Sequence, residues 1–192
     1  MSEIRSEPSS EDLEVPAQVP AVPAPVATPT ATGRPHWPVF LGLAALLVIA
    51  DQLTKAWLVS FLAPGKSINV VGDALRLVHS QNNGGLFGLL SGQAFIFGLV
   101  SLVVVGLIVL YHARAAPSQY VSITLGLLLG GAVGNLIDRL RLGYVVDFVD
   151  AGIGALRWYT FNVADAGISF AILLLLAASV WPSLTRTAAD RG

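Results

Sequence analysis

The sequence predicts an all-α integral membrane protein with four transmembrane helices and a small β/loop platform between the first and second helices. Charged residues make up only 12% of the 192 residues, whereas hydrophobic residues make up 54%. Soluble domains carry about 25% charged residues, so half that share indicates a membrane environment. Four segments are also apolar over about the 20 residues that a helix needs to cross a bilayer.

Charge and residue usage exclude several classes of function. The formal net charge is −1, so nothing indicates a nucleic-acid partner. Cysteine is absent, which excludes disulfides, a cysteine nucleophile and Cys-ligated zinc. The histidines His36, His79 and His112 lack the HExxH spacing, so we expect no metal site, and nothing in the sequence calls for a cofactor.

Residues 1–37 form a low-complexity tail. An acidic start is followed by VPAQVPAVPAPVATPTATGRPH, which is rich in proline, alanine and valine. This composition cannot build a packed core, so we predict a disordered tail, with a docking arm as the alternative. The segment lacks the basic start of a cleaved signal peptide.

The predicted spans are four hydrophobic segments. They run over residues 38–62, 94–111, 119–137 and 162–181. The second and third are uncharged throughout, and Pro182 follows the fourth as a stop signal. An even number of spans puts both termini on one side of the membrane. Lysines and arginines near the span ends divide almost evenly between the two sides, so the positive-inside rule does not choose the orientation.

Glycines predict how the third span packs. Gly126, Gly130, Gly131 and Gly134 form a small-xxx-small ladder, which lets helix backbones approach closely in lipid. Residues 63–93 are too long for a tight turn. Their SINVVGDALRLVHS stretch is β-branched and partly alternating, which favours one or two short strands before a glycine-rich turn.

Polar residues inside and at the end of the spans are candidates for a site, because ionisable groups in a membrane are costly unless paired or used. Asp51 and Lys55 lie four positions apart and can form an ion pair on one helix face, where they could simply neutralise each other. Asn135, Asp138 and Arg139 share one face at the end of the third span. The alternative for Asp138 and Arg139 is that they only mark where that span ends.

Two further carboxylates flank the start of the fourth span. Asp147 lies in the apolar run YVVDFV, where desolvation favours its protonated form. Asp165 follows Asn162 by three residues, which is also the spacing of a helix capping box, so Asp165 could serve only as a cap. If the two carboxylates converge, they share a proton. The ionised one can then activate a water while the protonated one polarises a peptide carbonyl.

The chain resembles the bacterial lipoprotein signal peptidases (signal peptidase II) over about residues 38–183. Four blocks carry the resemblance in the family's order: DQLTK at 51–55, NNGGLFG at 82–88, GGAVGNLIDR at 130–139 with VVDF at 145–148, and FNVAD at 161–165. The resemblance implies that Asp147 and Asp165 are the catalytic pair. It implies a supporting or substrate-binding role for Asp51, Lys55, Asn82, Gly84, Asn135, Asp138, Arg139 and Asn162. Gly85-Leu86 departs from the two small residues, often Ala-Ala, that are usual in the family.

The resemblance also implies a substrate and a location. The substrate is a prolipoprotein whose cysteine carries a diacylglyceryl group, and cleavage falls just before that cysteine. The enzyme is a multi-pass protein of the bacterial cytoplasmic (inner) membrane, with cytoplasmic termini and the platform and active site near the outer leaflet. We expect a peptidase domain over 38–183, a short cytoplasmic tail over 184–192, contact with membrane lipids and a monomer.

Two other functions remain as alternatives. A small ion-coupled transporter would also use intramembrane acids, but it should place them near the bilayer midplane. A non-catalytic scaffold would use the glycine ladder and tolerate changes at the two aspartates.

If Asp147 and Asp165 form the catalytic pair, their roles should differ. The helix dipole favours the anion at Asp165, so we expect Asp165 to act as the base and Asp147 to carry the proton.

Overall fold

The computed structural model describes residues 36–84, 94–115 and 117–185, which belong to one compact unit. Of the predicted N-terminal tail (1–37), residues 1–35 lie outside the described residues. Of the predicted C-terminal tail (184–192), residues 186–192 lie outside them. Gly85 and Leu86, where the chain departs from the family pattern, also lie outside them. Predictions about these segments remain predictions.

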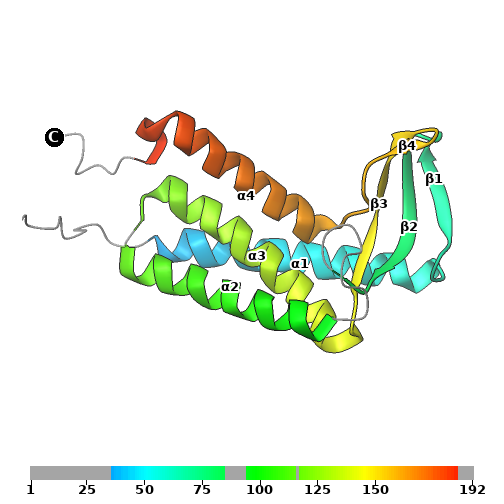
Figure 1. The fold of residues 1–192 in the computed structure, drawn as a ribbon, viewed down its shortest axis with the longest axis horizontal. Coiled ribbons are helices and arrows are strands. Elements are labelled where there is room, and N and C mark those ends of the chain that lie inside the picture. The colour runs from blue at the N-terminus through cyan, green and yellow to red at the C-terminus, as the bar shows by residue number, and fades with distance from the viewer. Residues whose placement is uncertain (1–35, 85–93, 116, 186–192) are drawn as a thin grey trace, which may run out of the picture. The chain divides into compact units, whose positions relative to one another are not determined.

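Four helices are long and apolar enough to cross a membrane, as predicted. They are α1 (Trp37–Phe61), α2 (Ala94–Ala115), α3 (Gln119–Leu142) and α4 (Val163–Val180), followed by the short 3-10 helix η2 (Pro182–Thr185). The long helices run side by side, with a small sheet at one end of the bundle (Figure 1). The protein is therefore a multi-pass membrane protein.

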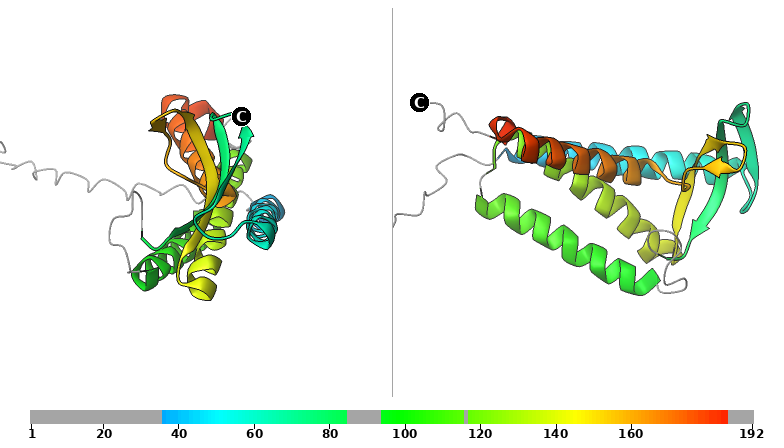
Figure 2. Two further views of the ribbon diagram at one scale, coloured as in Figure 1. Left: turned by 90° about the vertical axis from the view of Figure 1, so that its right-hand side faces the viewer. Right: turned by 45° about the horizontal axis from the view of Figure 1, so that its top comes forward.

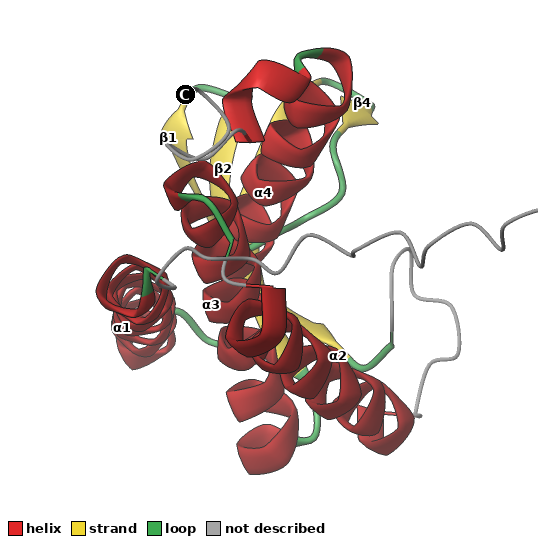
Figure 3. Ribbon diagram, turned by 90° about the vertical axis from the view of Figure 1, so that its left-hand side faces the viewer, coloured by secondary structure: helices red, strands yellow, loops and turns green. Residues whose placement is uncertain are grey.

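Helix α3 is the centre of the bundle. It contacts α1, α2 and α4, and the view along the bundle shows it among the other three (Figure 3). In its membrane-spanning window 56% of the residues are buried, against 17% to 22% for the other helices. The central position explains why this helix needs small residues on the sides that meet α1 and α4.

The glycine ladder packs as predicted. A Cβ on Gly126 would lie 2.7 Å from the backbone oxygen of Phe40 in α1, and one on Gly130 would lie 2.8 Å from that of Ala44. On the other side of α3, a Cβ on Gly131 would lie 2.5 Å from the backbone oxygen of Ala164 in α4. Since real Cβ contacts are almost never shorter than 3.0 Å, only glycine permits these approaches.

The predicted end of the third span, at residue 137, is wrong. Helix α3 continues to Leu142 and ends at Gly143, which takes the left-handed conformation with φ 78° and donates its N–H to Arg139. Asp138 and Arg139 therefore lie within the helix and do not mark its end. The helix tolerates Asp138 there because Lys55 neutralises it at 2.9 Å. Helix α2 likewise extends four residues past the predicted Tyr111, to Ala115.

The platform is a four-stranded antiparallel sheet in the order β1-β2-β3-β4 (Figure 2). Strands β1 (Ser67–Val71) and β2 (Leu75–Asn82) confirm the strands predicted after the first helix. Strands β3 (Val145–Ile153) and β4 (Leu156–Arg157) come from between α3 and α4. The prediction placed the platform between the first two helices, which holds for β1 and β2 but misses the two strands from between α3 and α4. The missed strand β3 is buried along most of its length, so it lacks the alternation that marks a half-exposed strand.

Strand register and helix packing bring the sheet onto the end of the bundle. Strand β2 pairs with β3 so that Asn82 lies opposite Val145, with a shift in register between Leu77 and Ser80. Leu58 and Leu62, at the end of α1, form a buried cluster with Val146 and Phe148 of β3. Asp147, between Val146 and Phe148 on β3, therefore points away from this cluster and meets Asn162 at the start of α4.

Candidate active site

Asp147 is held in β3 by two asparagine side chains. It is only 1% exposed. Asn82 Nδ2 donates to Asp147 Oδ2 at 3.0 Å, and Asn162 Nδ2 donates to Asp147 Oδ1 at 2.7 Å. Asn82 can reach Asp147 because the register places it opposite Val145, two residues away on the same face of the sheet.

Asp165 lies in the first turn of α4 and completes the predicted capping box. The backbone N–H of Asp165 donates to Asn162 Oδ1 at 2.9 Å, and the backbone N–H of Asn162 donates to Asp165 Oδ2 at 3.3 Å. Asp165 also accepts a hydrogen bond from Asn135 Nδ2 at 2.7 Å. Capping and membership of a polar site were alternatives at the sequence level, and Asp165 does both.

Asn162 joins the two aspartates. Its Oδ1 receives the backbone N–H of Asp165, while its Nδ2 lies 2.7 Å from Asp147 Oδ1 and 3.1 Å from Asn135 Oδ1. Asn162 is fully buried, so its polar atoms depend on these partners. Asn162 thereby links Asp147 on β3 to Asp165 on α4.

A network of charged side chains from α1 and α3 contacts Asn135, which in turn holds Asp165. The predicted ion pair forms, with Lys55 Nζ 2.8 Å from Asp51 Oδ2, and Lys55 also lies 2.9 Å from Asp138 Oδ2. Lys55 further donates to Asn135 Oδ1 at 3.3 Å. Asp51 and Lys55 therefore neutralise each other as predicted. Lys55 also pairs with Asp138 and donates to Asn135, the residue that contacts Asp165.

Sequence reasoning missed Gln52. Its Nε2 lies 2.9 Å from Asp138 Oδ1, 3.2 Å from Asp51 Oδ2 and 3.3 Å from the Gly134 backbone oxygen. A signal was available, because Gln52 precedes Lys55 by three positions and so shares its helix face.

Arg139 and Gly84 lie at the edge of the site. Arg139 donates to the backbone oxygens of Asn135 at 3.2 Å and Gly84 at 3.4 Å, and its guanidinium lies 5.8 Å from the centre of the Phe97 ring. The backbone N–H of Gly84 donates to Asn82 Oδ1 at 3.1 Å. All ten predicted site residues therefore connect, directly or through one another, to a single cluster.

Electrostatics separate Asp147 from an ordinary surface carboxylate. Burial and repulsion by Asp165 raise the pKa of Asp147 to about 7, against the opposing hydrogen bonds of Asn82 and Asn162 and the charge of Lys55. At Asp150, farther along β3, burial also opposes ionisation, but hydrogen bonds from Arg157 and Arg76 outweigh it and lower its pKa. The pKa of Asp147 thus lies near neutral pH, where a carboxyl group can both give and take a proton.

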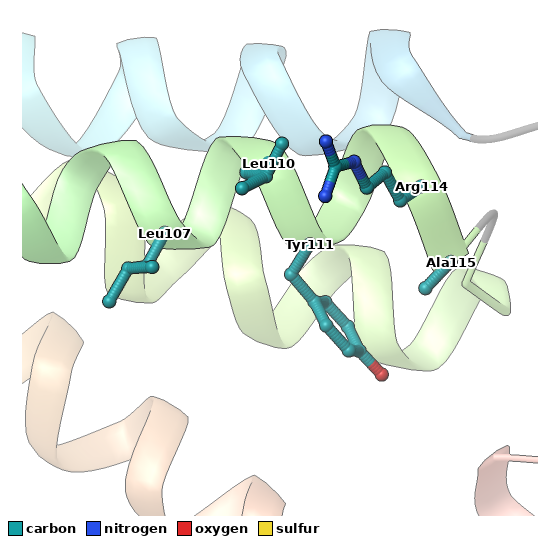
Figure 4. A pocket seen from close by; sticks show the side chains of 5 residues that line it. All are labelled: Leu107, Leu110, Tyr111, Arg114 and Ala115. Carbon is teal, nitrogen blue, oxygen red and sulfur yellow. The ribbon is translucent and has the colours of Figure 1, made fainter.

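Two grooves on the described surface lie on or beside α2. One, of about 340 Å³, lies between α2 and α3 beside the site and is lined by Phe95, Gly98, Leu99, Leu102, Leu136, Arg139, Leu140 and Gly143. The other, of about 370 Å³, lies on α2 and is lined by Leu107, Leu110, Tyr111, Arg114 and Ala115 (Figure 4). Only the first includes a residue of the cluster, Arg139. Within residues 36–84, 94–115 and 117–185, no three His, Cys, Asp or Glu side chains are grouped so as to hold a metal ion.

The sequence profile of the family described as Signal peptidase (SPase) II matches residues 43–181, which include α1 from residue 43 onward, all of α2, α3 and α4, and the sheet. The chain belongs to the signal peptidase II family. It is therefore a peptidase, and this membership does not support the transporter alternative. All ten residues of the cluster lie within the match to signal peptidase II.

Relatives in the signal peptidase II family align with this chain over most of their length. The lipoprotein signal peptidase of Geobacillus kaustophilus is 40% identical over 134 residues, covering 69% of this chain and 87% of the relative. The lipoprotein signal peptidase of Staphylococcus carnosus is 35% identical over 151 residues, covering 76% and 95%. A bacterial membrane enzyme solved by the in meso method at 1.9 Å is 29% identical with a TM-score of 0.70, covering 78% of this chain and 97% of that one.

Proposed function

We propose that this member of the signal peptidase II family removes signal peptides from diacylglyceryl-modified prolipoproteins, with Asp147 and Asp165 as the catalytic pair. The peptide bond just before the lipidated cysteine is the one cleaved. The observation that carries the catalytic assignment is that both carboxylates accept hydrogen bonds from Asn162, Asp147 from its side-chain amide and Asp165 from its backbone N–H. The printed names of the relatives, lipoprotein signal peptidases, support the substrate class.

The two aspartates have different roles in this proposal. Asp165 lies in the first turn of α4, where the helix dipole favours an anion, and it acts as the base. Asp147, with a pKa of about 7, holds the shared proton. Asp165 takes a proton from water as the water oxygen attacks the peptide carbonyl, and Asp147 gives its proton to the carbonyl oxygen. A neutral gem-diol results.

The diol then collapses and the pair is restored. Asp147, now ionised, takes a proton back from one diol hydroxyl. Asp165 passes its proton to the amide nitrogen as the carbon–nitrogen bond breaks. The products are the carboxyl end of the signal peptide and the amino group of the lipidated cysteine, and the pair again holds one proton. Supporting side chains keep the pair in place throughout: Asp51, Lys55, Asn82, Asn135, Asp138 and Asn162.

The groove between α2 and α3 suits the lipid of this substrate. Its lining is apolar except for Arg139, and it lies beside the cluster. We assign it to an acyl chain of the diacylglyceryl group, with Arg139 and the Gly84 backbone guiding the chain that carries the scissile bond.

We place both termini in the cytoplasm of the bacterial cell and the sheet and active site near the outer leaflet of the cytoplasmic membrane. Aromatic residues support an interface at each end of the bundle. Trp158, 74% exposed, lies between the sheet and α4, and Trp181, 60% exposed, lies at the far end of α4. The enzyme acts as a monomer in this arrangement.

The test is cleavage of a diacylglyceryl-modified prolipoprotein by the purified protein in detergent, with a chelator present. We expect cleavage by the wild type, and none by Asp147→Asn or Asp165→Asn variants that keep the wild-type melting temperature. The same prolipoprotein without its lipid should be a poor substrate. Near-full activity in either variant would overturn the dyad, whatever the substrate.

A further inference from the structure

The backbone just before each proposed catalytic aspartate is held by a carboxylate from another helix. Asp51 Oδ1, on α1, accepts the backbone N–H of Ala164 at 3.0 Å, and Ala164 precedes Asp165. Asp138 Oδ2, on α3, accepts the backbone N–H of Val146 at 3.1 Å, and Val146 precedes Asp147. Both carboxylates are buried, at 0% and 3% exposure, so water does not compete for these hydrogen bonds.

Two side chains of α1 join these carboxylates to each other. Lys55 Nζ lies 2.8 Å from Asp51 Oδ2 and 2.9 Å from Asp138 Oδ2. Gln52 Nε2 lies 3.2 Å from Asp51 Oδ2 and 2.9 Å from Asp138 Oδ1. A continuous path of hydrogen bonds therefore runs from the backbone at 164 to the backbone at 146.

We propose that Gln52 and Lys55 form a positioning bridge, which sets the separation of Asp147 and Asp165 by fixing Asp51 relative to Asp138. The inference rests on the proposed function, because the separation affects catalysis only if the two aspartates are the catalytic pair. Neither bridging residue has to touch the substrate. A displacement of about 1 Å in a catalytic constellation can cost about 100-fold in rate, so a small change in the bridge has a large effect on turnover.

Gln52→Met is the clean variant for this proposal. Gln52 is uncharged, so methionine removes its hydrogen bonds to both carboxylates, and the longer one to the Gly134 backbone oxygen, without changing the charge of the network. Thr54→Val is the matched control. Thr54 lies on the same helix at a similar depth, and it loses hydrogen bonds only to the backbone oxygens of Ala50 and Asp51.

Three quantities separate positioning from a merely structural role: kcat and KM with a diacylglyceryl-modified prolipoprotein, the melting temperature in detergent, and the pKa of Asp147 read by NMR from its labelled carboxyl carbon. For Gln52→Met we expect kcat to fall about tenfold to hundredfold with KM nearly unchanged. The melting temperature should match that of Thr54→Val. The pKa of Asp147 should fall towards its ordinary range, because repulsion by Asp165 raises it in the wild type.

Lys55→Arg is the second variant. It keeps the positive charge but replaces a compact ammonium by a planar guanidinium, so we expect the same loss of kcat with KM retained. Wild-type kcat and an unchanged Asp147 pKa in Gln52→Met would overturn the bridge. So would a loss of kcat that only follows a loss of melting temperature. Because the NMR titration does not require cleavage, it still tests the bridge if Asp147→Asn or Asp165→Asn proves active and the proposed function fails.

Discussion

The side-chain amide of Asn162 lies 2.7 Å from Asp147 Oδ1. The same side chain caps α4 through its oxygen, so one residue fixes the start of the helix and the orientation of a carboxylate on the neighbouring strand. A change at Asn162 should therefore affect the proposed catalytic pair far more than the stability of the helix.

For Asn162→Ala we expect kcat to fall by about 100-fold or more. Asp147 loses the amide that orients its carboxylate, and Asn135, which holds the carboxylate of Asp165, loses a hydrogen-bond partner. Stability should fall by only about 0.5–2 kcal/mol, the usual cost of losing an N-cap. Kinetics in detergent and a thermal melt measure the two effects.

Ser118→Ala is the matched control, since Ser118 is the N-cap of α3 and accepts a hydrogen bond from the Val121 backbone. It should lose stability to a similar or smaller degree while keeping wild-type kcat. An equal loss of activity in both variants would mean that Asn162 acts only as a cap.

The profile of kcat against pH should fall on its alkaline side near pH 7, and we call this fall the alkaline limb. Above the pKa of Asp147, which is about 7, the pair loses its shared proton, and nothing remains to protonate the carbonyl oxygen. The apparent value belongs to the pair. The hydrogen bond from Asn82 favours the ionised form of Asp147, so Asn82→Ala should raise that pKa and move the limb to higher pH.

The measurement is kcat against pH for the wild type and Asn82→Ala. Asn69→Ala removes an exposed amide from β1 of the same sheet and should leave the limb in place. A limb that moves to lower pH in Asn82→Ala would contradict the role of Asp147 as the proton carrier.

Gly131→Ala should destabilise the protein by about 1–3 kcal/mol through overpacking. The added Cβ would lie 2.5 Å from the backbone oxygen of Ala164, next to Asp165, so activity should fall as well. In Gly106→Ala the new Cβ meets nothing within 4 Å, so stability should stay the same or rise slightly. Thermal melts in detergent compare the two, and equal melting temperatures would show that α3 and α4 can move apart at no cost.

Asp150→Asn should destabilise the sheet by about 1.5–3 kcal/mol, since hydrogen bonds to charged groups contribute that much. Asp150 Oδ2 accepts from Arg76 at 2.6 Å, and Oδ1 accepts from Arg157 at 2.6 Å. Asp73→Asn is the control, because Asp73 is half-exposed and its ion pairs are longer, at 3.4 and 3.7 Å, so its loss should cost less than about 1 kcal/mol.

Lowering the pH should remove the stability that Asp150 contributes. The pKa of Asp150 is lowered in the folded protein, so its contribution to stability is present above its ordinary pKa and is lost as pH falls through the lowered value. The difference in melting temperature between wild type and Asp150→Asn should therefore shrink on acidification. A difference that stays constant below pH 4 would argue against this ion cluster.

Local features of the sequence were enough for the spans and for two of the contacts. Hydrophobic runs predicted four membrane helices. The i, i+4 spacing of Asp51 and Lys55 predicted their ion pair, and the i, i+3 spacing of Asn162 and Asp165 predicted the capping box. These features depend on neighbouring turns of one helix, so the chain itself determines them. The resemblance to a family supplied the candidate catalytic pair, whose role remains a prediction.

Tertiary structure decided how those parts meet. The pairing of β2 with β3 placed Asn82 beside Asp147, and the packing of α1 against α3 placed Gln52 and Lys55 on Asp138. The continuation of α3 past Asp138 also depends on that packing, because Lys55 neutralises the buried carboxylate. Such contacts join residues more than 60 positions apart. They depend on strand register and on the close approach of helices at glycines, which no periodicity within one segment encodes.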